Sequence, residues 1–195
     1  MFRNREEAGL LLAKRLGAYR DDPSGLILAL PRGGVAVGYS LSLTLRLPLD
    51  VFITRKLGAP EQPEYAIGAV TETGSVFLNP EAQAVLSAFS SSTAYLEKAI
   101  RAQQDEIARR QILCRQGRPL PVLTERTVLL VDDGIATGAT FLASVESLRG
   151  LGVKRLVAAI PVGPRDTLSR VREEVDELVA LITPEPFFAV GNHYE

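Results

Sequence analysis

The stretch VLLVDDGIATGAT, residues 128–140, decides the fold of this 195-residue chain. Its first four residues, Val128 to Val131, are all apolar, which is typical of a short strand buried on both faces of a parallel sheet. A polar loop follows, and apolar residues then return at helical spacing from Phe141 to Arg149, before Gly150 and Gly152. A buried strand, a loop and a helix in this order predict one unit of an α/β fold.

The same alternation of strands and helices extends along most of the chain. Further buried strands are predicted at residues 26–30, 49–54, 156–162 and 175–182. Helices are predicted from a cap at Asn4 to about Gly17, at residues 35–45 and at residues 166–174. We therefore predict a single α/β domain, residues 1–195, with a doubly wound, largely parallel sheet.

Residues 57–118 are predicted to be an insertion in that sheet. Its first part, residues 57–65, contains Gly58, Pro60 and Pro63 and is predicted to be a loop. Residues 67–70 and 75–78 flank a turn and predict a β-hairpin. The polar stretch Ser90 to Thr93 then offers a cap for a long charged helix, residues 95–118.

Composition bounds the class of protein. Hydrophobic residues make up 46% and charged residues 23% of the chain, which is ordinary for a globular domain. The single cysteine, Cys114, excludes an internal disulfide and fits a reducing compartment. The sequence shows neither a signal-peptide pattern nor a membrane-spanning apolar run, so we expect a cytoplasmic protein with no membrane partner. A net charge of -1 argues against nucleic acid as a partner.

Asp132 and Asp133 stand side by side where the predicted strand ends, and ligands of such sheets bind at strand ends. Successive side chains point to opposite faces, so one of the two carboxylates needs partners. Hydroxyl groups or a cation would satisfy both. The segment from Ala136 to Thr140 adds small side chains, hydroxyls and free N–H groups at a helix N-terminus, which suit a phosphate. The loop therefore predicts a diol or cation site beside a phosphate site.

A purely structural interpretation stays open, in which the two aspartates form a turn and Thr140 caps a helix. Two competing phosphate motifs are absent from the sequence. Ala139 stands where a P-loop carries its lysine, and no G-x-G-x-x-G follows a strand. The sequence thus argues against a nucleoside triphosphatase and against a dinucleotide oxidoreductase.

VLLVDDGIATGAT resembles, over its whole length, the phosphoribosyl pyrophosphate binding motif of the type I phosphoribosyltransferases. The resemblance implies that Asp132 and Asp133 are catalytic and bind the ribose hydroxyls and a metal ion, directly or through water. Mg²⁺ is the expected cofactor, because the sugar and diphosphate supply hard oxygen ligands. The rest of the loop would hold the same substrate: Gly134, Ile135, Ala136, Thr137, Gly138, Ala139 and Thr140.

Two other segments resemble the family's pyrophosphate contacts. The sequence PRGG follows the first core strand, and Arg32, Gly33 and Gly34 would bind the diphosphate there. Arg55 and Lys56 are candidate catalytic residues, because a leaving pyrophosphate needs cations where charge develops. The simpler interpretations are a tight turn for the PRGG segment and a solvated charge pair for Arg55 and Lys56.

The family also builds a hood over its acceptor, in many members from the segment after the last core strand. This layout predicts that residues 183–195 form a small C-terminal hood. Phe187 and Phe188 are the candidate acceptor-binding residues, because an aromatic ring stacks on a flat heterocycle, although packing at the sheet edge would explain them equally. The segments EYAIGAV and PFFAVGNHY are similar to a group of bacterial phosphoribosyltransferases whose substrates are not generally assigned.

The resemblance implies transfer of ribose 5-phosphate from phosphoribosyl pyrophosphate to a nitrogen acceptor, with release of pyrophosphate. A nucleobase is the expected acceptor. Ala136 stands where 6-oxopurine transferases carry an aspartate, which weakens that subclass and matches the adenine type. The alternative is a regulator that senses phosphoribosyl pyrophosphate or a nucleotide without chemistry. The sequence leaves a homodimer open.

Overall fold

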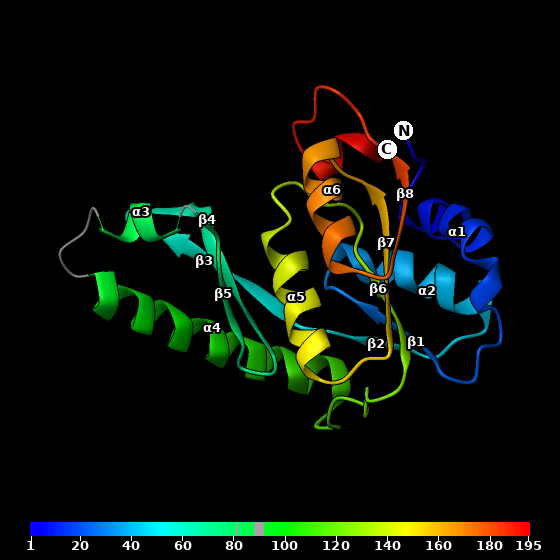
Figure 1. The fold of residues 1–195 in the computed structure, drawn as a ribbon, viewed down its shortest axis with the longest axis horizontal. Coiled ribbons are helices and arrows are strands. Elements are labelled where there is room, and N and C mark those ends of the chain that lie inside the picture. The colour runs from blue at the N-terminus through cyan, green and yellow to red at the C-terminus, as the bar shows by residue number, and fades with distance from the viewer. Residues whose placement is uncertain (81, 88–91) are drawn as a thin grey trace.

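The computed structural model describes residues 1–80, 82–87 and 92–195, and a parallel sheet of five strands forms its centre (Figure 1). The strands run in the order β2-β1-β6-β7-β8. Their bounds are Gly25–Ala29 for β1, Leu49–Val51 for β2, Thr127–Val131 for β6, Arg155–Val162 for β7 and Glu177–Ile182 for β8. Every residue of β1 and β6 is buried, as their uninterrupted apolar runs predict.

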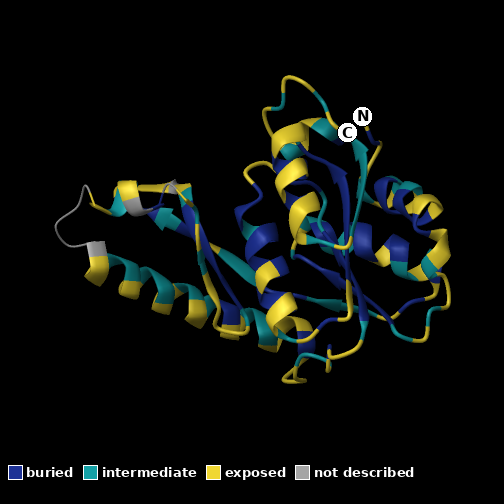
Figure 2. Cartoon of the chain, in the orientation of Figure 1, coloured by how far each residue is buried: buried dark blue, intermediate teal, exposed yellow. Residues whose placement is uncertain are grey.

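Helices cover both faces of this sheet. On one face, α1 (Arg5–Arg15) and α2 (Gly33–Leu45) pack Leu12 and Leu41 against Leu129 of β6. On the other, α5 (Ala139–Gly150) and α6 (Arg165–Glu174) contribute Phe141 and Leu168 to a core cluster that contains Leu130, the next residue of the same strand. Neighbouring residues of β6 thus serve opposite layers, and the buried strands lie between two layers of helix in Figure 2. The predicted doubly wound α/β fold is confirmed.

A second part of the molecule extends away from the parallel sheet (Figure 1). It is formed by the described residues between Thr54 and Arg115 and is called the arm below. It holds an antiparallel sheet of β3 (Thr54–Ala59), β4 (Gln62–Thr71) and β5 (Val76–Leu78), with α3 (Ala82–Ser87) and α4 (Ser92–Arg115). The predicted hairpin is confirmed, because β4 and β5 pair around a turn at Gly74. The predicted cap at Ser90 to Thr93 lies partly outside the described residues. Across the described ranges, no helix is both long and apolar enough to cross a membrane.

Two predictions for the arm were wrong. Arg55 and Lys56 do not end the second parallel strand, since β2 stops at Val51 and the basic pair lies inside β3. Residues 57–65 are not a loop either, because β3 and β4 pair through most of this segment. The two register shifts of that pairing fall on either side of Gly58, so the irregularity that glycine and proline introduce is absorbed as a bulge.

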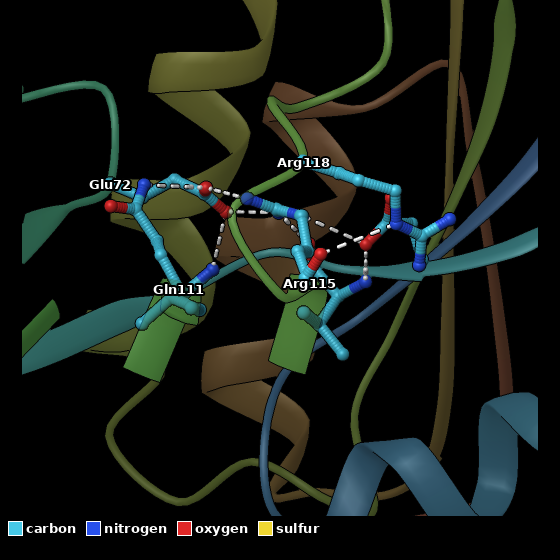
Figure 3. A network of polar contacts seen from close by, with 7 residues as sticks. Glu72, Gln111, Arg115 and Arg118 are labelled. Carbon is cyan, nitrogen blue, oxygen red and sulfur yellow. Dashed lines mark hydrogen bonds and ion pairs between the residues drawn. The ribbon is translucent and has the colours of Figure 1, made fainter. Parts of the chain in front are cut away.

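The base of the arm is fastened by a buried ionic cluster around Arg115, the last residue of α4 (Figure 3). Its guanidinium donates to Asp50 of β2 at 2.9 Å, to the backbone carbonyl of Val51, and to Glu72, the residue after β4. Glu72 also accepts from Gln111 at 3.1 Å. The side chains of Arg115 and Glu72 are each only 2% exposed. These contacts join α4, the second sheet and the edge of the parallel sheet.

Candidate functional site

The ends of β1 and β6 bring two of the predicted binding segments together. These strands are neighbours in register, with Ala29 beside Val131, so the residues that follow them meet at one edge of the sheet. A Cβ atom on Gly34 would lie 2.8 Å from the carbonyl oxygen of Val131 and 2.9 Å from the Cα of Asp132. A Cβ atom on Gly33 would overlap the Asp133 carboxylate. Only glycines permit this contact, which explains PRGG beside the acidic pair.

The two aspartates differ in their surroundings. The Asp132 carboxylate accepts a hydrogen bond from the backbone N–H of Asp133 at 2.8 Å. Burial, together with the neighbouring Asp133 charge, raises the pKa of Asp132 well above its usual value, and the Lys56 ammonium opposes this shift. A crowded acidic pair of this kind favours hydroxyl donors or a cation as ligands.

Asp133 has a partner that sequence reasoning missed. Arg5, the first residue of α1, donates from Nε to its Oδ2 at 2.6 Å. The hydroxyl of Tyr194, near the other end of the chain, donates to the backbone carbonyl of Asp133. Burial raises the pKa of Tyr194, which keeps that hydroxyl protonated. Arg5 belongs to no motif, and Tyr194 ends the segment PFFAVGNHY, but no local signal links either residue to Asp133.

The loop after the aspartates, which the sequence predicts to bind a phosphate, leads into the N-terminus of α5. Gly138 adopts a left-handed backbone, with a φ of 76°, and α5 begins at the next residue. Ala136 and Thr137 are exposed before the N-terminus of that helix, where free N–H groups gather. Thr167 of α6 stabilises the loop, because its hydroxyl donates to the carbonyl oxygen of Ala136 at 2.8 Å.

Two clefts meet at Lys56. The first, of about 540 Å³, runs between the arm and the strand ends; it is lined by Lys56, Tyr65, Ala66, Asn79, Ala136, Thr137, Pro164, Asp166, Thr167, Arg170, Phe187 and Phe188. The second, of about 510 Å³, passes from Pro31 along β3 to Thr140. Lys56 is exposed and lines both. Arg55 lines the second cleft but turns towards α4, where it donates to Gln103 at 3.0 Å.

The two phenylalanines of the last segment both line the first cleft, but they are held differently. Phe187 is half-buried against the packed chain ends and stacks on His193, with ring centroids 5.3 Å apart. Phe188 is 78% exposed. Of the two rings, Phe188 is the freer to stack on a ligand.

The acidic pair offers donors whose chemistry suits a hard cation. Within the described residues, no group of three or more His, Cys, Asp or Glu side chains could hold a metal ion. Two carboxylates still fit Mg²⁺, which takes one or two protein carboxylates and completes its shell with water and phosphate oxygens. Such an ion would depend on its ligand for most of its contacts.

Comparisons with known proteins agree with this arrangement. The family model "Phosphoribosyl transferase domain" matches residues 7–195. The Mycobacterium tuberculosis protein named "Putative phosphoribosyl transferase Rv0571c" is 42% identical over 194 residues, which is 100% of this chain and 43% of that protein. The chain therefore spans less than half the length of the curated relatives it matches.

Solved structures share the fold. The protein TT1426 from Thermus thermophilus superposes with a TM-score of 0.79 and 39% identity, over 99% of this chain and 89% of that one. A purine phosphoribosyltransferase from Pyrococcus horikoshii superposes with a TM-score of 0.50 and 20% identity, over 95% and 90%, which is a likeness of fold alone. With the family model matching nearly every residue, the chain belongs to the phosphoribosyl transferase domain family.

Proposed function

We propose that this chain transfers the ribose 5-phosphate group from phosphoribosyl pyrophosphate to a nitrogen acceptor and releases pyrophosphate. One observation carries the proposal: Gly33 and Gly34 lie directly against Asp132 and Asp133, beside a phosphate-type loop. A diphosphate, a diol and a monophosphate are the three parts of this substrate. The glycine pair, the aspartate pair and the loop match these three parts in that order.

The site residues divide the work by chemistry. Arg32, Gly33 and Gly34 would bind the diphosphate, and the loop from Gly134 to Thr140 would hold the 5-phosphate. Asp132 and Asp133 would hold the ribose hydroxyls and, directly or through water, Mg²⁺. When bound, this ion would neutralise charge on the diphosphate.

The leaving pyrophosphate would depart beside Lys56, which lines both clefts. Arg55 would contribute its charge from the arm side of the second cleft. As the bond between the anomeric carbon and the pyrophosphate oxygen breaks, positive charge develops on the sugar and negative charge on the leaving group. The protein's contribution is positioning and charge stabilisation of both.

The acceptor would bind in the first cleft, between Ala136 and the phenylalanines. A nucleobase suits an aromatic wall, and Ala136 offers no carboxylate to take a proton from it. Residues 1–195 would form one transferase domain, in which the arm and the hood at residues 183–195 frame the acceptor cleft.

Transfer itself is the test. The chain is incubated with Mg²⁺, labelled phosphoribosyl pyrophosphate and a panel of nucleobases, and labelled nucleotide and pyrophosphate are measured. Asp132→Asn combined with Asp133→Asn should abolish both turnover and calorimetric binding of phosphoribosyl pyrophosphate, because amides do not replace carboxylates towards a diol or a cation. The matched control is Glu173→Gln with Glu174→Gln, an adjacent exposed acidic pair at the end of α6.

The outcomes separate the alternatives. Unchanged affinity of the double aspartate variant would reject the site assignment. Tight binding by the parent chain without turnover on any base would instead favour the regulator that senses this ligand.

A further inference from the structure

We propose that Arg5 is a positioning residue for the Asp133 carboxylate, and that it orients this group towards the ribose hydroxyls. The inference rests on the proposed function. It adds a residue from the first helix, 128 positions away in sequence, to a site otherwise built from strand ends.

The geometry of the pair leaves one oxygen of Asp133 for a ligand. Arg5 engages Oδ2 through Nε at 2.6 Å, and a second polar neighbour of this carboxylate is the side chain of Asp132. The Asp133 side chain is 15% exposed, so the carboxylate is not sealed off. The same carboxylate also lies against Gly33 of the PRGG segment, and this contact restricts the side-chain torsions of Asp133 as well. A carboxylate fixed on two sides presents its free oxygen in one direction.

Arg5 is itself held in place. Its guanidinium carbon lies 4.7 Å from the centre of the Tyr194 ring, within the range of a cation–π contact. Asn4 caps α1 by accepting from the N–H of Glu7 at 2.9 Å, which fixes the first turn that carries Arg5. The hydroxyl of Tyr194 then reaches the backbone of Asp133.

The two chain ends build this support together. The rings of Phe2 and Tyr194 pack in a tilted pair with centroids 5.5 Å apart, and the N–H of Phe2 donates to the carbonyl of His193 at 2.8 Å. The N–H of Glu195 donates to the carbonyl of Phe2 at 3.1 Å. Figure 1 shows the termini side by side at the strand ends. Both ends of the chain thus converge on Asp133.

A positioning role makes a selective prediction. Ligands that contain the ribose diol should depend on Arg5, whereas pyrophosphate, which lacks a diol, should not. An arginine that only stabilised the fold, or only attracted anions, would affect both kinds of ligand alike. The inference can therefore be separated from general electrostatics.

The experiment measures the affinity of three probes by calorimetry: phosphoribosyl pyrophosphate and ribose 5-phosphate with Mg²⁺, and pyrophosphate without it, because an ion held by Asp133 would otherwise couple pyrophosphate binding to Arg5. Arg5→Met should weaken the first two about tenfold, which corresponds to about 1.4 kcal/mol, and leave pyrophosphate within about twofold. Arg5→Lys should recover part of the loss, because the charge remains without the planar fork. Arg3→Met, which removes the same charge from an exposed pair with Glu7, is the control and should change nothing.

A double-mutant cycle adds the decisive comparison. If Arg5 acts through Asp133, then Arg5→Met should have no further effect in an Asp133→Asn background. Additive losses, unchanged affinity for the ribose ligands, or an equal loss for pyrophosphate would each overturn the inference. A parent chain that binds none of the three probes would reject the proposed function first, and this inference with it.

Discussion

At the base of the arm, Arg115 meets Glu72 and Asp50 with 2% of its side chain exposed, whereas at the strand ends Arg5 meets Asp133 with 40% exposed. Both arginines join segments that are far apart in sequence. The first cluster is closed, since Glu72 accepts from Arg115, from Gln111 and from the N–H of Ile53. The second is open, and its carboxylate lies against Gly33.

The difference separates two uses of charge. A buried charge whose hydrogen bonds are all made by the protein has no capacity left for a ligand, so its effect falls on stability and on the geometry of the arm. A partly exposed charge whose hydrogen-bonding capacity is not used up by the protein costs little folding stability, and it remains able to bind a ligand. The two clusters should therefore respond oppositely to substitution.

The largest effect is expected at the closed cluster. Arg115→Met should lower the free energy of unfolding by about 3–5 kcal/mol, because Glu72 would stay buried without its cation. Urea unfolding measures this loss. Arg109→Met, on the same helix but in an exposed pair with Glu106, should change stability by less than about 1 kcal/mol.

Should Arg115→Met fail to fold, the double variant with Glu72→Gln offers a second measurement. Removing both charges should restore part of the stability, since Glu72, the more deeply buried of the two carboxylates, is then no longer an uncompensated ion. If Arg115→Met lowered the free energy of unfolding by less than about 1 kcal/mol, the base of the arm would have to be open to water. The proposed difference between the two clusters would then be wrong.

The sequence predicts the open region better than the closed one, for a physical reason. Val128 to Thr140 specify strand, loop and helix through local signals, and register with β1 then brings Gly34 to Asp132. Arg115 looked like any charge on a solvated helix, because its burial depends on β2 and β4, which lie far away in sequence. Arg5 was missed for the same reason.

The arm shows where local rules mislead. Gly58, Pro60 and Pro63 are typical breakers, yet they lie in or beside paired strands. Pairing across β3 and β4 outweighs the local preference, and the register shifts at Gly58 absorb the misfit. Basic residues predicted at a strand end consequently alternate between two faces of β3, which gives Arg55 and Lys56 different surroundings.

A smaller effect, on binding more than on stability, is expected in the phosphate loop. Gly138→Ala places a Cβ 2.7 Å from the methyl group of Thr167 on a backbone with a φ of 76°. The strain should cost about 1–2 kcal/mol of stability. Displacement of the loop should weaken ribose 5-phosphate at least about tenfold by calorimetry, since its N–H groups no longer converge on the phosphate.

Gly150→Ala is the matched control, because no heavy atom lies within 4 Å of its added Cβ. It should leave both affinity and the unfolding midpoint close to those of the parent. If ribose 5-phosphate bound the Gly138 variant as tightly as the parent, the phosphate would have to lie elsewhere, and the open region would lose its proposed ligand.

The smallest effect, and the finest test of open against closed, concerns the two adjacent phenylalanines. Phe188 is 78% exposed on the first cleft, whereas Phe187 packs against the chain ends and stacks on His193. Phe188→Ala should therefore weaken nucleoside 5′-monophosphates by about 1 kcal/mol, through loss of base stacking, without changing stability. Phe187→Ala should mainly lower the unfolding midpoint, because it opens a gap in packed side chains.

Ribose 5-phosphate, which has no base, provides the internal control, and its affinity for the Phe188 variant should stay unchanged. Equal losses of stability in both variants, with no difference between the ligands, would show that neither ring meets the base and that the acceptor binds against another wall of the cleft.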